Sequence, residues 1–309
     1  MSESPSPLIA SVEAGGTKFV CAIGSGPTCI ITEERIPTTT PDETIGRCLE
    51  FFNAQQATHG AVAALGVATF GPAGVTPMRA DYGCITTTPK PGWKNVPLLE
   101  MLRSQLGNIP AGFDTDVNAA ALAEWQWGAG QSTNSLLYYT IGTGIGGGFV
   151  SDAQPLHGLV HPEMGHMRLP HDRSRDPFVG ACPFHADCFE GLASGTAIEA
   201  RWNQSATKLP SDHVAWDLEA YYIALALTNS VCTLSPDTIV LGGGVMEQDH
   251  LFPRIRTRLV DYLNGYVDSP SILESIDRYV VPPGLGNQSG LLGGIALGLA
   301  ALDTVDHPR

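Results

Sequence analysis

The segment from Gly158 to Glu190 most constrains the fold of this chain, because it gathers metal-ligating side chains at close spacing. Two cysteines and two histidines follow the pattern H-x15-C-x2-H-x2-C: His166, Cys182, His185 and Cys188. Two thiolates and two imidazoles form a ligand set of closed, tetrahedral zinc sites. Because four protein ligands leave no position for a reactive water, we expect the metal to hold the segment in shape rather than to catalyse a reaction.

A second interpretation of the same segment needs no metal. Two buried free cysteines beside surface histidines would also produce this pattern, since cysteine is among the most buried residue types. Five of the nine histidines nevertheless fall between His157 and His185, and this clustering favours the metal site. Within it, His161 and His171 are alternatives to His166 as the fourth ligand.

The composition excludes several partners. The 309 residues carry a formal net charge of -14, whereas binding to nucleic acid requires a basic surface. The seven scattered cysteines are an odd number and do not form a disulfide framework. No apolar stretch is long enough to span a membrane, and the first residues lack the basic and apolar regions of a signal peptide. We therefore expect a cytoplasmic protein that binds neither nucleic acid nor membranes.

Three glycine-rich turns follow expected strands, which cover residues 8–13, 135–141 and 238–241. Glycine lets the backbone approach a phosphate and point several N–H groups at it, and threonine adds a hydroxyl donor. A single turn of this kind often only reverses a hairpin, but three in one chain favour a nucleotide. No Walker A loop or Rossmann pattern is present. The candidate nucleotide-binding residues are Gly15, Gly16, Thr17, Lys18, Thr143, Gly144, Gly242, Gly243, Gly244 and Val245.

The first two turns share one arrangement of strand, glycine turn and strand. LIASVEAGGTKFVCAIG at 8–24 can be aligned by eye with LLYYTIGTGIGGGFVSD at 136–152. This likeness predicts two related halves that face each other across a cleft. Further strands alternate with helices along the chain, so the expected fold class is α/β. The expected helices cover residues 42–59, 98–106, 117–127, 195–202, 217–234, 249–263 and 289–302.

Asp116 is the candidate catalytic residue, because it stands where an expected strand passes into the helix that follows it. A carboxylate there can accept the proton of a hydroxyl nucleophile. Phosphoryl transfer needs little more than that base, oriented reactants and Mg²⁺ to shield the phosphates. The alternative is that Asp116 caps the helix N-terminus, for which aspartate is well suited. Both roles can coexist.

Glu163, His166 and Glu190 are candidate sugar-binding residues. Charged acceptors form short, directional hydrogen bonds with sugar hydroxyls. Thr115 and Asp116 complete the expected substrate-binding group. In the alternative interpretation, the two glutamates only support the metal ligands as hydrogen-bond partners.

These motifs resemble the ROK family of sugar kinases (repressors, open reading frames, kinases), and more narrowly its zinc-containing bacterial fructokinases. The resemblance extends from Glu13 to about Ala300. The family signature begins at Ile141, runs through GTGIGGGF and continues to His166 without a break. The other matching motifs are EAGGTK at 13–18, GPAG at 71–74, TTPKPGW at 87–93, HPEMGH at 161–166 and GGGV at 242–245.

The resemblance implies the ribonuclease-H-like fold shared with actin and hexokinases, duplicated as two lobes around a cleft. It implies ATP-dependent phosphorylation of D-fructose, with Asp116 as general base and with sugar contacts from the three residues named above. ATP contacts are implied at Thr143 and along the turn from Gly242 to Met246. The resemblance also implies a homodimer with structural Zn²⁺, and Mg²⁺ bound with ATP.

We expect the two lobes to divide the chain near residue 114. Residues 1–113 would form a small N-terminal α/β lobe, completed by the C-terminal helix 289–309. Residues 114–288 would form a large C-terminal α/β lobe that contains the zinc-binding segment 158–190.

Two departures from the family pattern concern the identity of the sugar. Many family glucokinases carry C-x-C-G-x2-G-C beside the zinc, whereas this chain has CPFHADC at 182–188. That histidine in place of one cysteine favours fructokinase. Many members also have Asn-Asp at the catalytic position, where this chain has Thr115 and Asp116. Both departures leave the transfer chemistry intact, so glucose and mannose stay alternatives to fructose.

Two alternatives to a kinase are weaker. A sugar-responsive repressor of the same family would need a helix-turn-helix before the first phosphate turn, but only twelve residues precede Glu13 and the chain is acidic. A non-catalytic sugar-binding protein would be expected to have lost Asp116 or a glycine turn, and the chain has kept both.

Overall fold

The computed structural model describes residues 6–306, which divide into two compact units. Unit 1 comprises residues 1–128, 153–162 and 287–309, and unit 2 comprises residues 129–152 and 163–286. The boundary expected after residue 113 falls inside the last strand of unit 1. The expected C-terminal helix belongs to unit 1 and is described to Asp306, so its residues 307–309 lie outside the described part.

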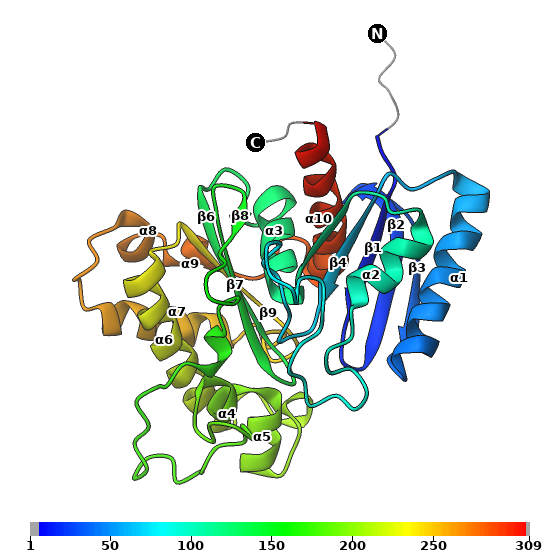
Figure 1. Ribbon diagram of the computed structural model, residues 1–309. Coiled ribbons are helices and arrows are strands. Elements are labelled where there is room, and N and C mark those ends of the chain that lie inside the picture. The colour runs from blue at the N-terminus through cyan, green and yellow to red at the C-terminus, as the bar shows by residue number, and fades with distance from the viewer. Residues whose placement is uncertain (1–5, 307–309) are drawn as a thin grey trace. The chain divides into compact units, whose positions relative to one another are not determined.

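Unit 1 is built on a five-stranded mixed sheet of order β3-β2-β1-β4-β5 (Figure 1). The central β1 pairs antiparallel with β2 and parallel with β4, and β4 pairs parallel with β5. Every residue of β4 is buried, as expected for a strand covered on both faces. The strands are β1 (Ile9–Ala14), β2 (Lys18–Gly26), β3 (Cys29–Pro37), β4 (Ala64–Thr69) and β5 (Ala111–Thr115).

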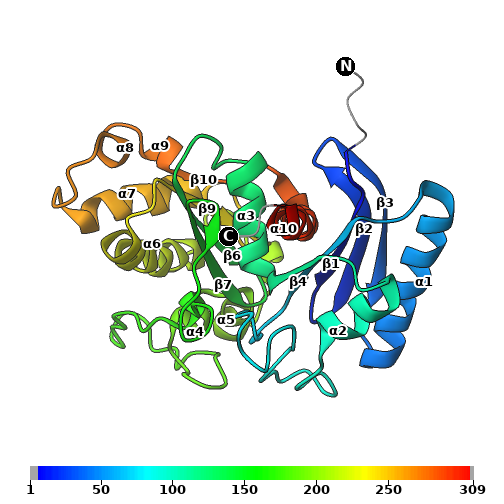
Figure 2. The same cartoon turned by 45° about the horizontal axis from the view of Figure 1, so that its top comes forward.

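Helices cover both faces of this sheet (Figure 2). On one face α10 (Ser289–Asp306) packs beside α3 (Asp116–Trp127) and against β1, β4 and β5. On the other, α1 (Pro41–His59) lies against β2 and β3, and α2 (Leu98–Arg103) with the short η1 (Ser104–Leu106) lies near β5. Gly66 lets α10 approach β4 closely, because a Cβ atom there would lie 1.7 Å from the carbonyl oxygen of Gly294.

Unit 2 contains four strands of a second mixed sheet of order β10-β9-β6-β7-β8, and its edge strand β8 belongs to the segment 153–162 of unit 1. The central β6 pairs antiparallel with β7 and parallel with β9, which pairs parallel with β10. The short β8 ends this sheet where the chain passes between the units. The strands are β6 (Ser135–Ile141), β7 (Ile145–Ser151), β8 (Gln154–Pro155), β9 (Thr238–Gly242) and β10 (Val280–Val281).

The core of unit 2 includes buried side chains of the long helix α6, which packs along α7 (Figure 1). The segment between η2 and α4 is mostly irregular. The helices are α4 (Phe189–Ala193), α5 (Gly195–Trp202), α6 (Ala215–Leu234), α7 (Leu251–Leu263), α8 (Pro270–Leu273) and α9 (Ile276–Tyr279), and the 3-10 turns are η2 (Met164–His166) and η3 (Ala206–Lys208). A third 3-10 turn, η4 (Gly286–Gln288), begins at the last residue of unit 2 and continues into unit 1. None of the helices within residues 6–306 combines the length and apolarity needed to cross a membrane.

The predicted duplication is confirmed by the sheets. Read from its other edge, the second sheet has the order β8-β7-β6-β9-β10, which matches β3-β2-β1-β4-β5 strand for strand. The strand β7 begins inside the glycine run, where Gly146, Gly147 and Gly148 pair with β6. Glycine is needed there because a Cβ atom on Gly147 would lie 2.7 Å from the Tyr139 ring. The turn is therefore shorter than the run of glycines, because the last three glycines of the run belong to β7.

Candidate functional site

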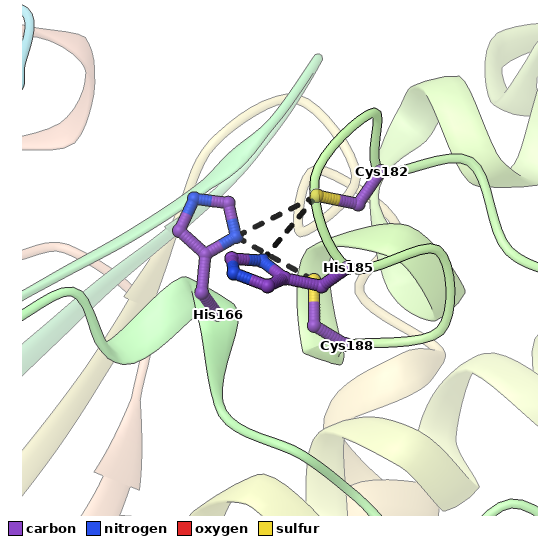
Figure 3. Close-up of side chains that lie close together, drawn as sticks. All are labelled: His166, Cys182, His185 and Cys188. Atoms are coloured by element: carbon purple, nitrogen blue, oxygen red, sulfur yellow. Dashed lines mark hydrogen bonds between the residues drawn. The ribbon is translucent and has the colours of Figure 1, made fainter. Parts of the chain in front are cut away.

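The four side chains of the H-x15-C-x2-H-x2-C pattern come together in unit 2 (Figure 3). His166 ends the 3-10 turn η2, which follows the irregular segment after β8. Cys182 and His185 lie in a tight turn in which the Cys182 and Ala186 backbones exchange hydrogen bonds. Cys188 immediately precedes α4. Both cysteines are buried and His185 is exposed, so the cluster lies near the surface.

The distances fit a tetrahedral metal site. His166 Nδ1 lies 3.5 Å from Cys188 Sγ and 3.8 Å from Cys182 Sγ, and His185 Nδ1 lies 3.7 Å from Cys182 Sγ. A tetrahedron with Zn–S bonds of about 2.3 Å and Zn–N bonds of about 2.0 Å has edges of about 3.3–3.8 Å. The Nδ1 atom of His166 faces the thiols, and its Nε2 atom points away from them (Figure 3). The cluster can therefore hold a metal ion.

The structure excludes the two alternative fourth ligands among the described residues. His161 belongs to unit 1, where its Nε2 accepts a hydrogen bond of 3.2 Å from the Ala73 backbone N–H. His171 bonds instead to the Asp187 carboxylate, at 3.1 Å, and to the Asp176 backbone carbonyl, at 2.9 Å. The local spacing left this choice open, and the backbone path after β8 decides it in favour of His166.

Asp116 is the first residue of α3 and follows β5 directly, as the sequence predicted. Its alternative role as helix N-cap is wrong. The cap is Thr115, whose hydroxyl accepts a hydrogen bond of 3.2 Å from the Asn118 N–H. The Asp116 carboxylate is partly exposed and accepts a hydrogen bond from the Val117 N–H. Because Thr115 caps the helix, the Asp116 carboxylate is not needed as the cap. A carboxylate at the start of the helix can take part in acid-base chemistry.

Sequence reasoning missed the pair of Asp114 and His157, which lie near Asp116 in unit 1. Asp114 is only 2% exposed. One carboxylate oxygen accepts hydrogen bonds from Thr115 N–H and Asn118 Nδ2, and the other lies 2.8 Å from His157 Nε2. This hydrogen bond raises the pKa of His157, although burial offsets part of the effect. The pair ties the segment 153–162 to the strand end that carries Asp116.

Glu190 lies in the first turn of α4, two residues after Cys188 of the candidate metal cluster. Its Oε2 atom accepts a hydrogen bond of 2.9 Å from the Ile145 N–H, at the start of β7. A Cβ atom on Gly144 would lie 2.6 Å from the same oxygen. The exposed Glu163 precedes η2, and its carbonyl oxygen accepts the His166 N–H. Within unit 2, Glu190 therefore links the second glycine turn to the candidate metal cluster. The predicted sugar-binding residues Glu163 and His166 lie in the same part of the chain as that cluster.

The first two glycine turns are exposed hairpin turns. In unit 1, Gly16, Thr17 and Lys18 are exposed between β1 and β2. In unit 2, the exposed Thr143 lies between β6 and β7. Exposed glycine-rich backbone of this kind can bind an anion through its N–H groups.

The third turn follows β9 in unit 2. Gly243 has a φ of 89°, a conformation that favours glycine, and a Cβ atom there would lie 2.6 Å from the Ile141 backbone. The side chains of Val245 and Met246 are buried in the core, and Gly244 is exposed. The backbone around Gly244 is therefore the part of this turn that a nucleotide could reach.

Comparisons with known proteins agree with these features. The sequence pattern of the ROK family matches residues 9–301. The fructokinase of Pediococcus pentosaceus is 45% identical over 295 residues, which cover 96% of this chain and 99% of that protein. The fructokinase of Zymomonas mobilis is 41% identical over 296 residues, which cover 94% of this chain and 96% of that protein.

A solved structure shares the fold. The ROK family glucokinase of Streptomyces griseus, determined in complex with glucose and AMPPNP, superimposes with a TM-score of 0.74 at 23% identity and covers 95% of this chain and 99% of its own. The family match over nearly the whole chain, the duplicated sheets and the clustered motif residues lead to one conclusion: this chain belongs to the ROK family.

Proposed function

We propose that this protein is an ATP-dependent fructokinase, which phosphorylates D-fructose at its 6-hydroxyl. One observation carries the proposal: 45% identity to a fructokinase over nearly the full length of both chains. Two structural features support it. A carboxylate lies at the start of α3, and the predicted sugar-binding residues are joined to a glycine turn of the type that binds phosphate.

In the proposed reaction, Asp116 accepts the proton of the 6-hydroxyl as its oxygen attacks the γ-phosphorus of ATP. The new O–P bond forms as the bond to the ADP oxygen breaks, so the phosphoryl group moves to the sugar. Glu163, the Nε2 atom of His166 and Glu190 bind and orient the sugar hydroxyls. Mg²⁺ bound with ATP would supply positive charge that offsets the charge of the phosphates.

Backbone N–H groups of the turns at Gly15–Lys18 and Gly142–Gly148 are proposed to bind the ATP phosphates. Thr143 would add its hydroxyl. The turn from Gly242 to Met246 would contact the adenosine through its backbone.

The metal proposed for the four-residue cluster is zinc. Two thiolates and two imidazoles at these distances suit Zn²⁺ in a closed site. His166, Cys182, His185 and Cys188 would hold it and thereby fix the segment that carries Glu163 and Glu190. Its role is structural, and no step of the reaction passes through it. The proposal also retains a homodimer and a cytoplasmic location.

The experiment that tests the proposal measures ATP consumption with Mg²⁺ in the presence of fructose, glucose, mannose and N-acetylated hexosamines. We expect turnover with fructose far above that with the other sugars. Equal or greater turnover with glucose or mannose would keep the kinase and change its substrate. No turnover with any of these sugars would contradict the kinase and favour a non-catalytic sugar-binding protein.

A further inference from the structure

A buried ion pair outside the candidate metal cluster joins Asp176, in the segment between η2 and α4, to Arg201 of α5. Asp176 is 3% exposed and the Arg201 side chain is 7% exposed. Two contacts join them, Nε to Oδ1 at 3.3 Å and Nη2 to Oδ2 at 3.1 Å. This is the two-pronged geometry that only a planar guanidinium offers to a carboxylate. A buried charge pair with this geometry holds its two chain segments together.

The surroundings of Asp176 complete its hydrogen bonding. The Tyr222 hydroxyl donates to Oδ2 at 2.7 Å, and the Phe178 N–H donates to Oδ1 at 3.2 Å. The Phe178 ring also lies against the Arg201 guanidinium, 4.5 Å from centroid to Cζ. Because α5 carries Arg201 and α6 carries Tyr222, the irregular segment is fastened to two helices without any metal.

Arg201 makes one further contact, and it leads to the candidate sugar site. Its Nη2 atom donates a hydrogen bond of 2.8 Å to the carbonyl oxygen of Leu192, in the last turn of α4. A helix of five residues is too short to be stable by itself. The metal ligand Cys188 fixes one end of α4, and Arg201 holds the other end. Glu190 lies between these two attachments.

Glu219 does not compete for Arg201 as an ionic partner. Its side chain, in α6, is 1% exposed, and no described atom forms a hydrogen bond with its Oε1. Burial raises the pKa of Glu219 well above its ordinary value, and the charge of Arg201 offsets only part of this rise. The neutral carboxyl is therefore favoured, and Asp176 is the anion that pairs with Arg201.

We propose that Arg201 is a positioning residue for sugar binding: it orients α4, and through it Glu190, independently of the metal. The inference rests on the proposed function, in which Glu190 contacts the sugar. Glu190 already bonds to Ile145 N–H at 2.9 Å, so a small displacement of α4 would misplace the carboxylate for both partners. The contacts of α5 with the Gly142–Thr143 turn come from its other end, at Gly195 and Thr196. Loss of Arg201 would therefore affect the sugar more than ATP.

The test compares Arg201→Lys with wild-type enzyme. Lysine keeps the charge but cannot contact both Asp176 oxygens and Leu192 at once. We expect the KM for fructose to rise about tenfold or more, because a displacement near 1 Å can cost that much in binding and orientation. The KM for ATP and kcat should stay within about twofold, as for a loss of ground-state binding, and the bound metal should stay at wild-type content. The matched control is Arg258→Lys on α7, whose partner Asp217 is half exposed, and it should change neither KM.

A double-mutant cycle with Glu190→Gln decides whether Arg201 acts through Glu190. If it does, Arg201→Lys has little further effect on the KM for fructose once Glu190 is altered. Additive effects, or an unchanged KM in Arg201→Lys, would overturn the inference. Should Arg201→Lys fail to fold, Tyr222→Phe carries the test, because it removes only one hydrogen bond to Asp176. A several-fold rise in the KM for fructose supports the inference, and no rise overturns it. Failure of the proposed function is distinguishable, because the wild-type enzyme would then show no fructose-dependent ATP consumption.

Discussion

The two units share one sheet topology but support their glycine turns differently. In unit 1 the turn is held by a residue just after the neighbouring strand: Thr38 donates its N–H to the Thr17 carbonyl at 2.9 Å and its hydroxyl to the Gly15 carbonyl at 2.7 Å. In unit 2 the turn is held from a distance in sequence, because Gly195 N–H donates to the Gly142 carbonyl at 2.7 Å and Glu190 accepts Ile145 N–H. A duplicated sheet can therefore acquire an inserted segment on which one turn depends, here the segment that carries the candidate metal cluster.

The corresponding strand ends also differ. In unit 1, β5 passes directly into α3, which begins with Asp116. In unit 2 the corresponding strand, β10, is followed by Pro282 and Pro283 and by no helix until the 3-10 turn η4. The same position in the sheet thus offers a carboxylate at a helix start in one unit only. This difference is the reason to assign proton transfer to unit 1.

The largest expected effect tests that assignment. Asp116→Asn should lower kcat by about 10²–10⁴-fold, because it removes the group that accepts the hydroxyl proton. The amide keeps the size of the side chain, and Thr115 still caps α3, so the KM for fructose should change little. Steady-state kinetics with fructose and ATP measure both quantities. Turnover close to that of the wild-type enzyme would remove Asp116 as the base.

The second prediction concerns the metal-tied segment of unit 2. Cys182→Ser should release the metal and lower fructose-dependent activity at least about tenfold, because metal-binding free energy also orders the segment that carries Glu163 and Glu190. Metal analysis together with kinetics measures the outcome. Cys232→Ser is the control, since Cys232 is an exposed cysteine of the same unit. A metal-free Cys182→Ser enzyme with full activity would show that the segment needs no metal.

The third prediction compares the glycine turn of unit 1 with the first glycine turn of unit 2. Gly144→Ala should raise the KM for fructose several-fold in addition to the KM for ATP, because its Cβ atom would lie 2.6 Å from the Glu190 carboxylate that binds Ile145, within the turn proposed to bind ATP phosphates. Gly16→Ala meets no atom within 4 Å, so its free energy of unfolding should change by less than about 0.5 kcal/mol. If ATP phosphates approach this turn, its KM for ATP should rise instead. If the two variants changed the KM for fructose and the KM for ATP in the same way, the proposed difference between the turns would be wrong.

The smallest expected effect is the pH dependence of the Asp114–His157 pair in unit 1. The hydrogen bond to Asp114 raises the pKa of His157 above 6.5 in the folded protein. Its stabilisation is therefore fully present below the unfolded-state pKa, and it is lost as the pH rises through the folded-state pKa. His157→Gln should cost less than about 1 kcal/mol at about pH 6 and less still at about pH 9, because the side chain is partly exposed.

Urea unfolding of wild-type and His157→Gln proteins at the two pH values measures this difference. His59→Gln is the control, because His59 is an exposed histidine at the end of α1 in the same unit. A cost that grows as the pH rises would mean that neutral His157 is the form that stabilises the pair.

Local patterns predicted much of this molecule. The spacing of Cys182, His185 and Cys188 indicated the metal cluster, since residues so close in sequence meet through a single turn. The alternation of strand and glycine turn predicted both hairpins, and the strand before Asp116 placed it at a helix start. Short elements such as α4, α8 and β10 escaped prediction, because a few residues carry no readable periodicity.

Long-range packing decided the remaining features. The sequence left three histidines as candidates for the fourth metal ligand, and only the path of the chain after β8 brings His166 to the thiols. The pairing of Arg201 with Asp176, and of His157 with Asp114, joins segments that no local spacing connects. Residue types and short-range periodicity determine which groups and elements are available. The burial that makes two charged groups pair depends on the whole chain being folded.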